Sequence, residues 1–397
     1  MASRRVQLHF GRFVHPIYRE QLHAVPEGWS YGFTHPALTD ATVPTKRVVE
    51  RGARFARARA VAERVALLAL SEGGYVHRVR ARPLPGAALI HSCERLLRRS
   101  ELPYVLDLEH AELFVLYQRA ALTRPWARAA LERALADEQL RFLLPWSEAA
   151  RRSVLVSLGP GVASRVASKL RVVSPAIRLA AERPHERRGG PLRALFVGTL
   201  FVEKGGVEAV RAVREARRTH DVTLDIVTYA PPSWAARLQA EPGVDVHAPA
   251  GADFIQHLYA QADVLLFPSH MDTFGYVVME AMAHGLPVLA PAHLALEETI
   301  EDEVSGLLFP AENMLYGEDT RSVVRHSVPT PSEYLQRLQQ PGDAYVSGIA
   351  RTLTRLAEEP GLHARLAHGA HESVRVGHLS VDRRRAALRE IYDEAAG

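Results

Sequence analysis

The alternation of short apolar runs with amphipathic segments constrains the fold more than any other feature of this sequence. The alternation occurs twice, before and after a polar stretch of Pro, Arg and Gly at residues 182–190, which predicts a linker. Short strands that alternate with helices favour a parallel sheet covered on both faces. We therefore expect an α/β protein of two doubly wound, Rossmann-like domains.

The predicted elements follow from apolar periodicity and from Pro, Gly and charged boundaries. Ser147 is placed to cap the helix that follows it. Strands are expected at 5–10, 87–90, 104–108, 142–144, 170–173, 192–197, 224–228, 264–267 and 287–289, and helices at 48–70, 127–138, 208–218, 344–358 and 382–395.

Composition is that of a globular protein, with 47% hydrophobic and 24% charged residues among 397. No apolar run approaches the ~20 residues of a membrane span, and the N-terminus lacks the pattern of a signal peptide. The single cysteine, Cys93, excludes an internal disulfide and a cysteine-only zinc cluster. We expect a cytoplasmic protein.

The net charge of +4 conceals an asymmetry between the two halves. Residues 1–190 hold 31 Lys and Arg against 17 Asp and Glu, or +14, and the remainder holds 18 against 28, or −10. Such a basic half favours an anionic partner, such as a lipid-phosphate acceptor or the inner face of a membrane. The alternative is an ordinary solvated surface of an Arg-rich chain. We expect no nucleic-acid partner.

The stretch 267–290, FPSHMDTFGYVVMEAMAHGLPVLA, carries two carboxylates eight positions apart, Asp272 and Glu280. A Thr-Phe-Gly turn between them opens an apolar helix. With 3.6 residues per helical turn, a separation of eight residues places both acids on roughly the same side. The free amides at a helix N-terminus favour anions. The expected ligand therefore carries phosphate and hydroxyl groups, as a nucleotide sugar does.

This stretch resembles the E-x7-E signature of the retaining family 4 glycosyltransferases, with Asp272 in place of the first Glu. Residues 195–206 (LFVGTLFVEKGG) resemble the strand-loop-helix with which family members bind the donor diphosphate. Residues 298–310 (ETIEDEVSGLLFP) resemble the stretch that follows the signature, and the resemblance covers about residues 190–315. It implies a GT-B fold with a crevice between the domains. Residues 1–181 would form the acceptor-side domain, 191–379 the nucleotide-sugar domain, and helix 380–397 would pack back on the first.

The resemblance also implies roles for individual residues. Lys204 would bind the donor diphosphate, and glycines beside it permit close backbone approach. The family usually has Arg where this chain has Thr199, so Arg12 in the first loop is a candidate to supply the contact. Residues implied at the donor are Gly11, Arg12, Gly198, Thr199, Lys204, Gly205, Thr273, Phe274, Gly275 and Glu280.

Asp272 would hold hydroxyls of the donor sugar and Glu280 those of the ribose, while Thr273 is placed to cap the helix. A carboxylate such as Glu280 on an apolar helix needs a partner. His110 follows a predicted strand, where family members often have a histidine near the reacting sugar. Asp107 and Glu109 resemble a metal-binding pair only superficially, and we expect no metal or other cofactor.

Together these features predict a retaining glycosyltransferase that uses a UDP- or GDP-type sugar and a hydroxyl of a glycan, lipid-linked or small-molecule acceptor. One alternative is a non-catalytic subunit or scaffold that binds a nucleotide sugar. Another is a related GT-B epimerase that acts on a sugar nucleotide. A serine hydrolase, a Walker-loop NTPase and a Gly-x-Gly-x-x-Gly dinucleotide enzyme have no matching motif.

Overall fold

The computed structural model divides the chain into two compact units. It describes residues 3–10, 14–35, 76–116, 122, 124–249, 251–270, 272–312 and 331–397. The first unit consists of Met1–Ala176 with Val381–Gly397, and the second of Ile177–Ser380. The predicted α/β class with two Rossmann-like units is confirmed. The helix predicted at 48–70 lies outside the described residues.

Residues 182–190, predicted as a linker, belong to the second unit. Backbone hydrogen bonds explain this assignment. The amides of Ala180 and Ala181 donate to the carbonyl of Ala283 at 2.9 and 3.2 Å, and the amide of His185 donates to Gly285 at 3.3 Å. A polar Pro- and Gly-rich composition predicted a loop here, but it could not reveal that the loop docks on a helix end.

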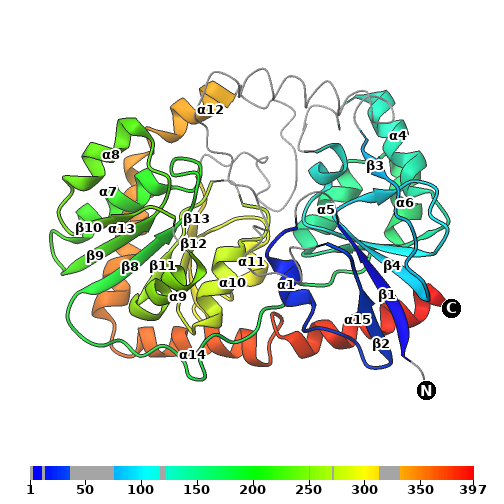
Figure 1. Cartoon of the computed structure of the whole chain (residues 1–397). Helices are drawn as coiled ribbons and strands as arrows, with labels where there is room; N and C mark the ends of the chain where they lie inside the picture. The colour runs from blue at the N-terminus through cyan, green and yellow to red at the C-terminus, as the bar shows by residue number, and fades with distance from the viewer. Residues whose placement is uncertain are drawn as a thin grey trace. The chain divides into compact units, whose positions relative to one another are not determined.

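The first unit is built on a parallel sheet in the order β2-β1-β4-β6-β7, in which the order of the strands reverses between β1 and β4. That order is the flavodoxin-like form of a doubly wound sheet. Figure 1 labels β2, β1 and β4 of this sheet. Its strands are β1 Arg4–His9, β2 Trp29–Gly32, β4 Ala87–Cys93, β6 Tyr104–Leu108 and β7 Leu140–Pro145; β3 Arg78–Val79 pairs with β5 Leu96–Leu97. The other described elements are α1 Ile17–Gln21, η1 Ala111–Val115, α4 Pro125–Leu135, α5 Glu148–Val156 and α6 Pro160–Ala167.

Two local predictions in this unit have opposite outcomes. Ser147 caps α5, because its hydroxyl accepts a hydrogen bond from the amide of Ala150 at 3.0 Å. The strand predicted at 170–173 is wrong, since Leu170 makes a single parallel bridge to Leu143 and the ladder goes no further. Leu170 and Val173 are buried here without forming a strand ladder.

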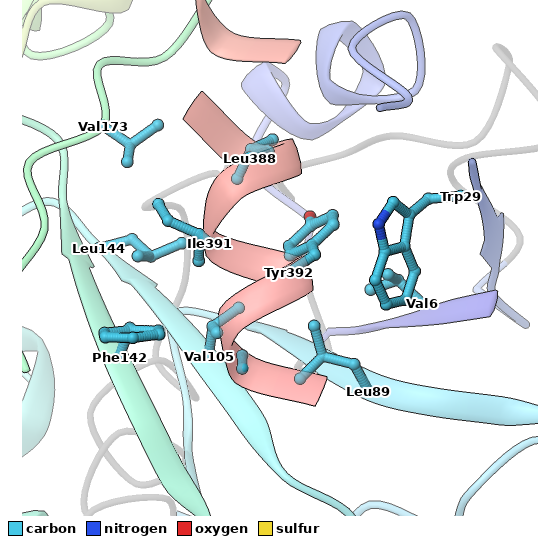
Figure 2. Close-up of a cluster of buried hydrophobic side chains, with 11 residues drawn as sticks. Val6, Trp29, Leu89, Val105, Phe142, Leu144, Val173, Leu388, Ile391 and Tyr392 are labelled. Atoms are coloured by element: carbon cyan, nitrogen blue, oxygen red, sulfur yellow. The ribbon is translucent and has the colours of Figure 1, made fainter. Parts of the chain in front are cut away.

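The last helix, α15 (Val381–Ala396), packs on the sheet of the first unit. Leu388, Ile391 and Tyr392 share a buried cluster with sheet residues (Figure 2). Beside them the buried Arg384 pairs with Asp107 at 2.8 Å. The sheet members of the cluster include Val6, Leu89, Val105, Phe142 and Leu144.

The second unit has its strands in the order β10-β9-β8-β11-β12-β13, all parallel in the described chain (Figure 1). This is the Rossmann order 3-2-1-4-5-6. The order in which the strands are added reverses between the first and fourth strands, here β8 and β11. The strands are β8 Leu192–Val197, β9 Val222–Val227, β10 Val244–His247, β11 Val264–Leu266, β12 Val288–Ala292 and β13 Gly306–Pro310.

Helices cover both faces of this sheet, with α7 beside α13 on one face and α10 beside α14 on the other (Figure 1). Among the described residues, no helix has both the length and the apolar character needed to cross a membrane. The helices are α7 Gly206–Ala216, α8 Pro232–Gln239, α9 Ala252–Gln261, α10 Tyr276–Ala283, α11 Leu296–Thr299, α12 Pro331–Leu338, α13 Asp343–Glu358 and α14 Leu362–Arg375.

Candidate functional site

Two predicted site residues meet at the point where the second sheet reverses its strand order. Lys204 lies in the loop after β8 and Asp272 in the loop after β11. The ammonium of Lys204 is 2.7 Å from a carboxylate oxygen of Asp272, and the side chains are 21% and 15% exposed. Ligands of doubly wound sheets bind beyond the carboxyl ends of the strands at this reversal. The pair therefore occupies the position where such a fold accepts a ligand.

The two loops approach so closely that one position requires glycine. Gly205 has φ +81°, and a Cβ atom built there would lie 2.0 Å from the carbonyl oxygen of Pro268. The amide of His270 also donates to the carbonyl of Glu203 at 3.2 Å. These contacts hold the Lys204 loop and the Asp272 loop close together, which allows the two side chains to form their ion pair. At Gly198 a Cβ atom would already meet the Cβ of Lys204 at 3.0 Å.

The start of α10 differs from the prediction. Its N-cap is Gly275, at φ +85°, and not Thr273. Because the helix begins at Tyr276, Asp272 precedes it, and helical periodicity does not relate Asp272 to Glu280. Asp272 is placed instead by Lys204 and by the amide of Phe274, which donates to its second carboxylate oxygen at 3.4 Å.

Glu280 lies within α10 and is half-buried. The hydroxyl of the buried Tyr259, on α9, lies 3.3 Å from its carboxylate and 3.3 Å from the carbonyl of Val277. Burial and then the charge of Glu280 raise the pKa of Tyr259 well above its ordinary value, so the phenol keeps its proton and donates. The sequence predicted that Glu280 needs a partner but did not identify Tyr259.

A buried ion pair supports both loops and was not predicted. His270 Nε2 is 2.6 Å from Glu208 Oε1, and both side chains are 0% exposed. His270 Nδ1 is 3.0 Å from the carbonyl of Glu312. Burial acts to lower the pKa of His270, but Glu208 and that carbonyl raise it overall. Both ring nitrogens therefore donate, and the imidazolium is held between two acceptors.

His293 adds a neutral polar group beside these charges. It is buried and follows β12. Burial lowers its pKa to about 4, with Asp272 acting to raise it and His270 and Lys204 to lower it. At neutral pH its imidazole is uncharged. With 19 histidines in the chain, no local sequence signal separated His270 and His293 from the others.

His110 belongs to the first unit, at the carboxyl end of β6. It is buried, and its Nδ1 accepts from the amide of Glu112 at 3.4 Å as the cap of η1. Asp107, the second-last residue of β6, pairs with Arg384 at 2.8 Å and with His91 at 3.3 Å. Both contacts are made by Oδ2 of Asp107. Gly11 and Arg12 lie outside the described residues.

Comparison with known proteins supports the reading of the second unit. Residues 191–317 match the family model described as Glycosyl transferases group 1. This stretch contains Lys204, Asp272 and Glu280.

Two curated relatives are D-inositol 3-phosphate glycosyltransferases. The one from Streptomyces bingchenggensis is 32% identical over 162 residues, which cover 41% of this chain and 28% of that protein. The one from Saccharomonospora viridis is 27% identical over 318 residues, which cover 79% of this chain and 60% of that protein. The chain thus spans less than two thirds of either relative.

The fold matches solved structures over nearly the whole chain. The crystal structure of Anabaena HepE with UDP and glucose has a TM-score of 0.60 at 14% identity and covers 98% of this chain and 99% of that one. Sucrose-phosphate synthase from Thermosynechococcus elongatus has a TM-score of 0.59 at 16% identity, with 99% of each chain covered. The predicted GT-B class, with two Rossmann-like units, is therefore confirmed.

Proposed function

We propose that this chain is a retaining glycosyltransferase that transfers a sugar from a UDP- or GDP-type donor to an acceptor hydroxyl. The observation that carries the proposal is the meeting of Lys204 and Asp272 at the strand-order reversal of the second unit. Both residues lie in the stretch that matches the group 1 glycosyl transferase model. The relatives named as glycosyltransferases support the same reaction class.

Each group at this site has a role that its charge allows. The ammonium of Lys204 and the amides at the starts of α7 and α10 would stabilise negative charge on the departing diphosphate. Asp272 would accept hydrogen bonds from donor-sugar hydroxyls. Glu280, with one contact from Tyr259, would accept hydrogen bonds from the ribose.

The resemblance to family 4 supports a reaction without an enzyme nucleophile. The bond from the anomeric carbon to the diphosphate breaks as the acceptor oxygen bonds to that carbon on the same face. The acceptor proton leaves with a diphosphate oxygen. Lys204 favours this step because charge on the diphosphate grows as the bond breaks. We propose that the transfer reaction needs no metal ion bound to the donor.

Lys204 and Asp272 neutralise each other when no donor is bound. Donor binding would therefore replace the ion pair by two contacts. Lys204 would bind the phosphate, and Asp272 would bind the sugar hydroxyls. This exchange predicts that Lys204→Ala affects catalysis more than folding. A preorganised charge on a leaving group contributes about 10²–10³ in turnover. A partly exposed ion pair contributes only about 1 kcal/mol to stability.

The test is a thermal-shift screen with uridine, guanosine, adenosine and thymidine diphosphates and their sugars, followed by donor-hydrolysis and transfer assays. Arg211→Ala is the matched control, because Arg211 also pairs with a carboxylate in this unit, Asp343. We expect a base-selective shift and turnover that are lost in Lys204→Ala and kept in Arg211→Ala. Unchanged turnover in Lys204→Ala contradicts the proposal.

The same assays separate the alternatives. Donor binding without hydrolysis or transfer indicates a non-catalytic subunit. An epimerised sugar nucleotide formed without acceptor indicates the epimerase reaction.

We further propose that the protein is cytoplasmic and that its basic first half contacts an anionic surface. The +14 charge of residues 1–190 supports this proposal. Flotation with liposomes that contain anionic lipid, at low and high salt, tests it. Absence of binding at low salt contradicts it, because screening is weakest there.

A further inference from the structure

Three potential metal ligands from separate elements meet at the other end of the second sheet. His185 lies in the segment before β8, Asp263 directly precedes β11, and His363 is in the first turn of α14. One donor atom from each lies within 4.8 Å of the other two. Asp263 and His363 are buried and His185 is partly exposed. Two imidazoles and a carboxylate form a donor set suited to zinc and related ions.

The distance between two of these ligands is informative. His185 Nε2 and Asp263 Oδ1 are 3.4 Å apart. Bonds of 2.0–2.1 Å at a tetrahedral angle separate two zinc ligands by about 3.3–3.4 Å. A direct charge-assisted hydrogen bond is about 2.7–2.9 Å.

Histidine–carboxylate pairs in the same unit range from this shorter distance to 3.0 Å for His220 and Glu358 and 3.7 Å for His371 and Glu372. His270 and Glu208 are 2.6 Å apart, and His247 and Asp225 are 2.7 Å apart. The spacing of His185 and Asp263 is therefore compatible with two ligands of one ion, and in the absence of an ion the two groups form a long hydrogen bond. A third ligand within 4.8 Å needs to approach by no more than about 1.4 Å to reach a zinc-ligand separation of about 3.4 Å.

Outer hydrogen bonds hold each ligand in place. The second oxygen of Asp263 accepts from the amide of Arg193 at 2.9 Å. His363 Nε2 is 2.8 Å from the carbonyl of Asp263, and a proton on that nitrogen leaves Nδ1 with its lone pair. The backbone of His185 is held by the hydrogen bond that its amide donates to the carbonyl of Gly285. Metal-binding histidines and carboxylates typically make such hydrogen bonds with their remaining polar atoms.

Solvent reaches the cluster from one side. His185 lines a surface hollow with Arg183, Pro184 and His284. This hollow supplies the entry path that a metal site needs. Arg183 and Arg188, which both line the hollow, repel a cation, but their charges are screened by water and salt at the surface.

We propose that His185, Asp263 and His363 bind one divalent ion of the zinc class, with water completing the coordination. The site lies at the amino end of β11, whereas Asp272 follows its carboxyl end. The ion therefore takes no part in sugar transfer, and the metal-free transfer proposed above is unaffected. Its effect is to join the segment that contains His185 to α14 and to the sheet, which stabilises the second unit.

The test uses the full chain, stripped with a chelator and dialysed. Zn²⁺ is titrated in competition with a chromophoric chelator, and bound metal is counted by mass spectrometry. His185→Gln removes one ligand at a partly exposed position. His247→Gln is the matched control, because it removes a histidine paired with an aspartate that has no third ligand nearby in the described chain.

We expect one zinc per chain in the wild type and in His247→Gln, and an affinity at least about 100-fold lower in His185→Gln. Zinc should raise the melting temperature of the first two proteins only. Circular dichroism establishes that each variant is folded, and nucleotide binding should be unchanged in His185→Gln. Equal zinc affinity in the two variants, or no competitor-resistant zinc in the wild type, overturns the proposal.

Discussion

Replacing Glu208 with glutamine should destabilise the loops that carry Lys204 and Asp272. The carboxylate of Glu208 is fully buried 2.6 Å from His270, which bonds through its other nitrogen to the carbonyl of Glu312. The variant keeps the shape and one hydrogen-bond acceptor but removes the negative charge. An imidazolium then lacks its counter-charge in a site without water contact, so His270 must lose its proton or remain unpaired.

The expected magnitude follows from this burial. Removing one partner of a buried ion pair costs about 3–5 kcal/mol, and the isosteric acceptor places Glu208→Gln near the lower end, about 3 kcal/mol. Asp225→Asn is the control, because it breaks the same kind of pair, with His247, at 28% and 32% exposure. That change should cost no more than about 1 kcal/mol.

The difference should also depend on pH in a defined direction. The pKa of His270 is raised in the folded protein, so its pairing contributes stability that is fully present below its ordinary pKa of about 6.5. That stability is lost as the pH rises through the higher folded value. The gap in free energy of unfolding between wild type and Glu208→Gln should therefore be widest near pH 6 and shrink at higher pH.

Amide hydrogen exchange followed by mass spectrometry measures this effect locally. Peptides that cover α7 and the loop between β11 and α10 report opening free energies for the second unit without treating both units as one transition. After correction for intrinsic exchange rates, the loss should appear in these peptides. A loss as small as in Asp225→Asn, or one that does not vary with pH, would refute the assignment of a buried, charged pair.

Three further changes test other parts of the structure. Gly205→Ala combines a positive φ with a clash against the carbonyl of Pro268 and should cost about 2–4 kcal/mol and weaken nucleotide binding; an unchanged melting curve contradicts the close loop contact. Asp107→Asn should cost about 3–5 kcal/mol by leaving Arg384 buried without its carboxylate. Burial opposes ionisation of Asp107, but Arg384 and His91 lower its pKa overall. In urea unfolding, the wild type should therefore keep a higher free energy of unfolding than Asp107→Asn until the pH falls through that lowered value. Burial raises the pKa of Cys93, so a thiol reagent at pH 8 should label the urea-unfolded chain and not the native one; rapid native labelling argues against burial.

Strand and helix positions could be predicted where the sequence carries a strong local pattern. The strands at Tyr104–Leu108 and Leu192–Val197 have the predicted bounds. The strands β2, β10 and β13 were missed, and each lies at an edge of its sheet. An edge strand pairs with a neighbour on one side only, and its sequence can then carry more polar residues. In β10, for example, Val-Asp-Val-His contains two charged or polar residues.

The two Rossmann-like halves and the loops of Lys204 and Asp272 were determined by the sequence alone, because periodicity and Gly-rich turns are local properties of the chain. Tertiary structure decided which groups meet there. Lys204 forms its hydrogen bond with Asp272, 68 positions away, and His270 forms one with Glu208, 62 positions away. Those contacts exist because β8 and β11 are neighbours in the sheet although β9 and β10 separate them in the chain. Local pattern sets where a strand begins and ends, but only packing of the whole sheet sets which strand lies beside it.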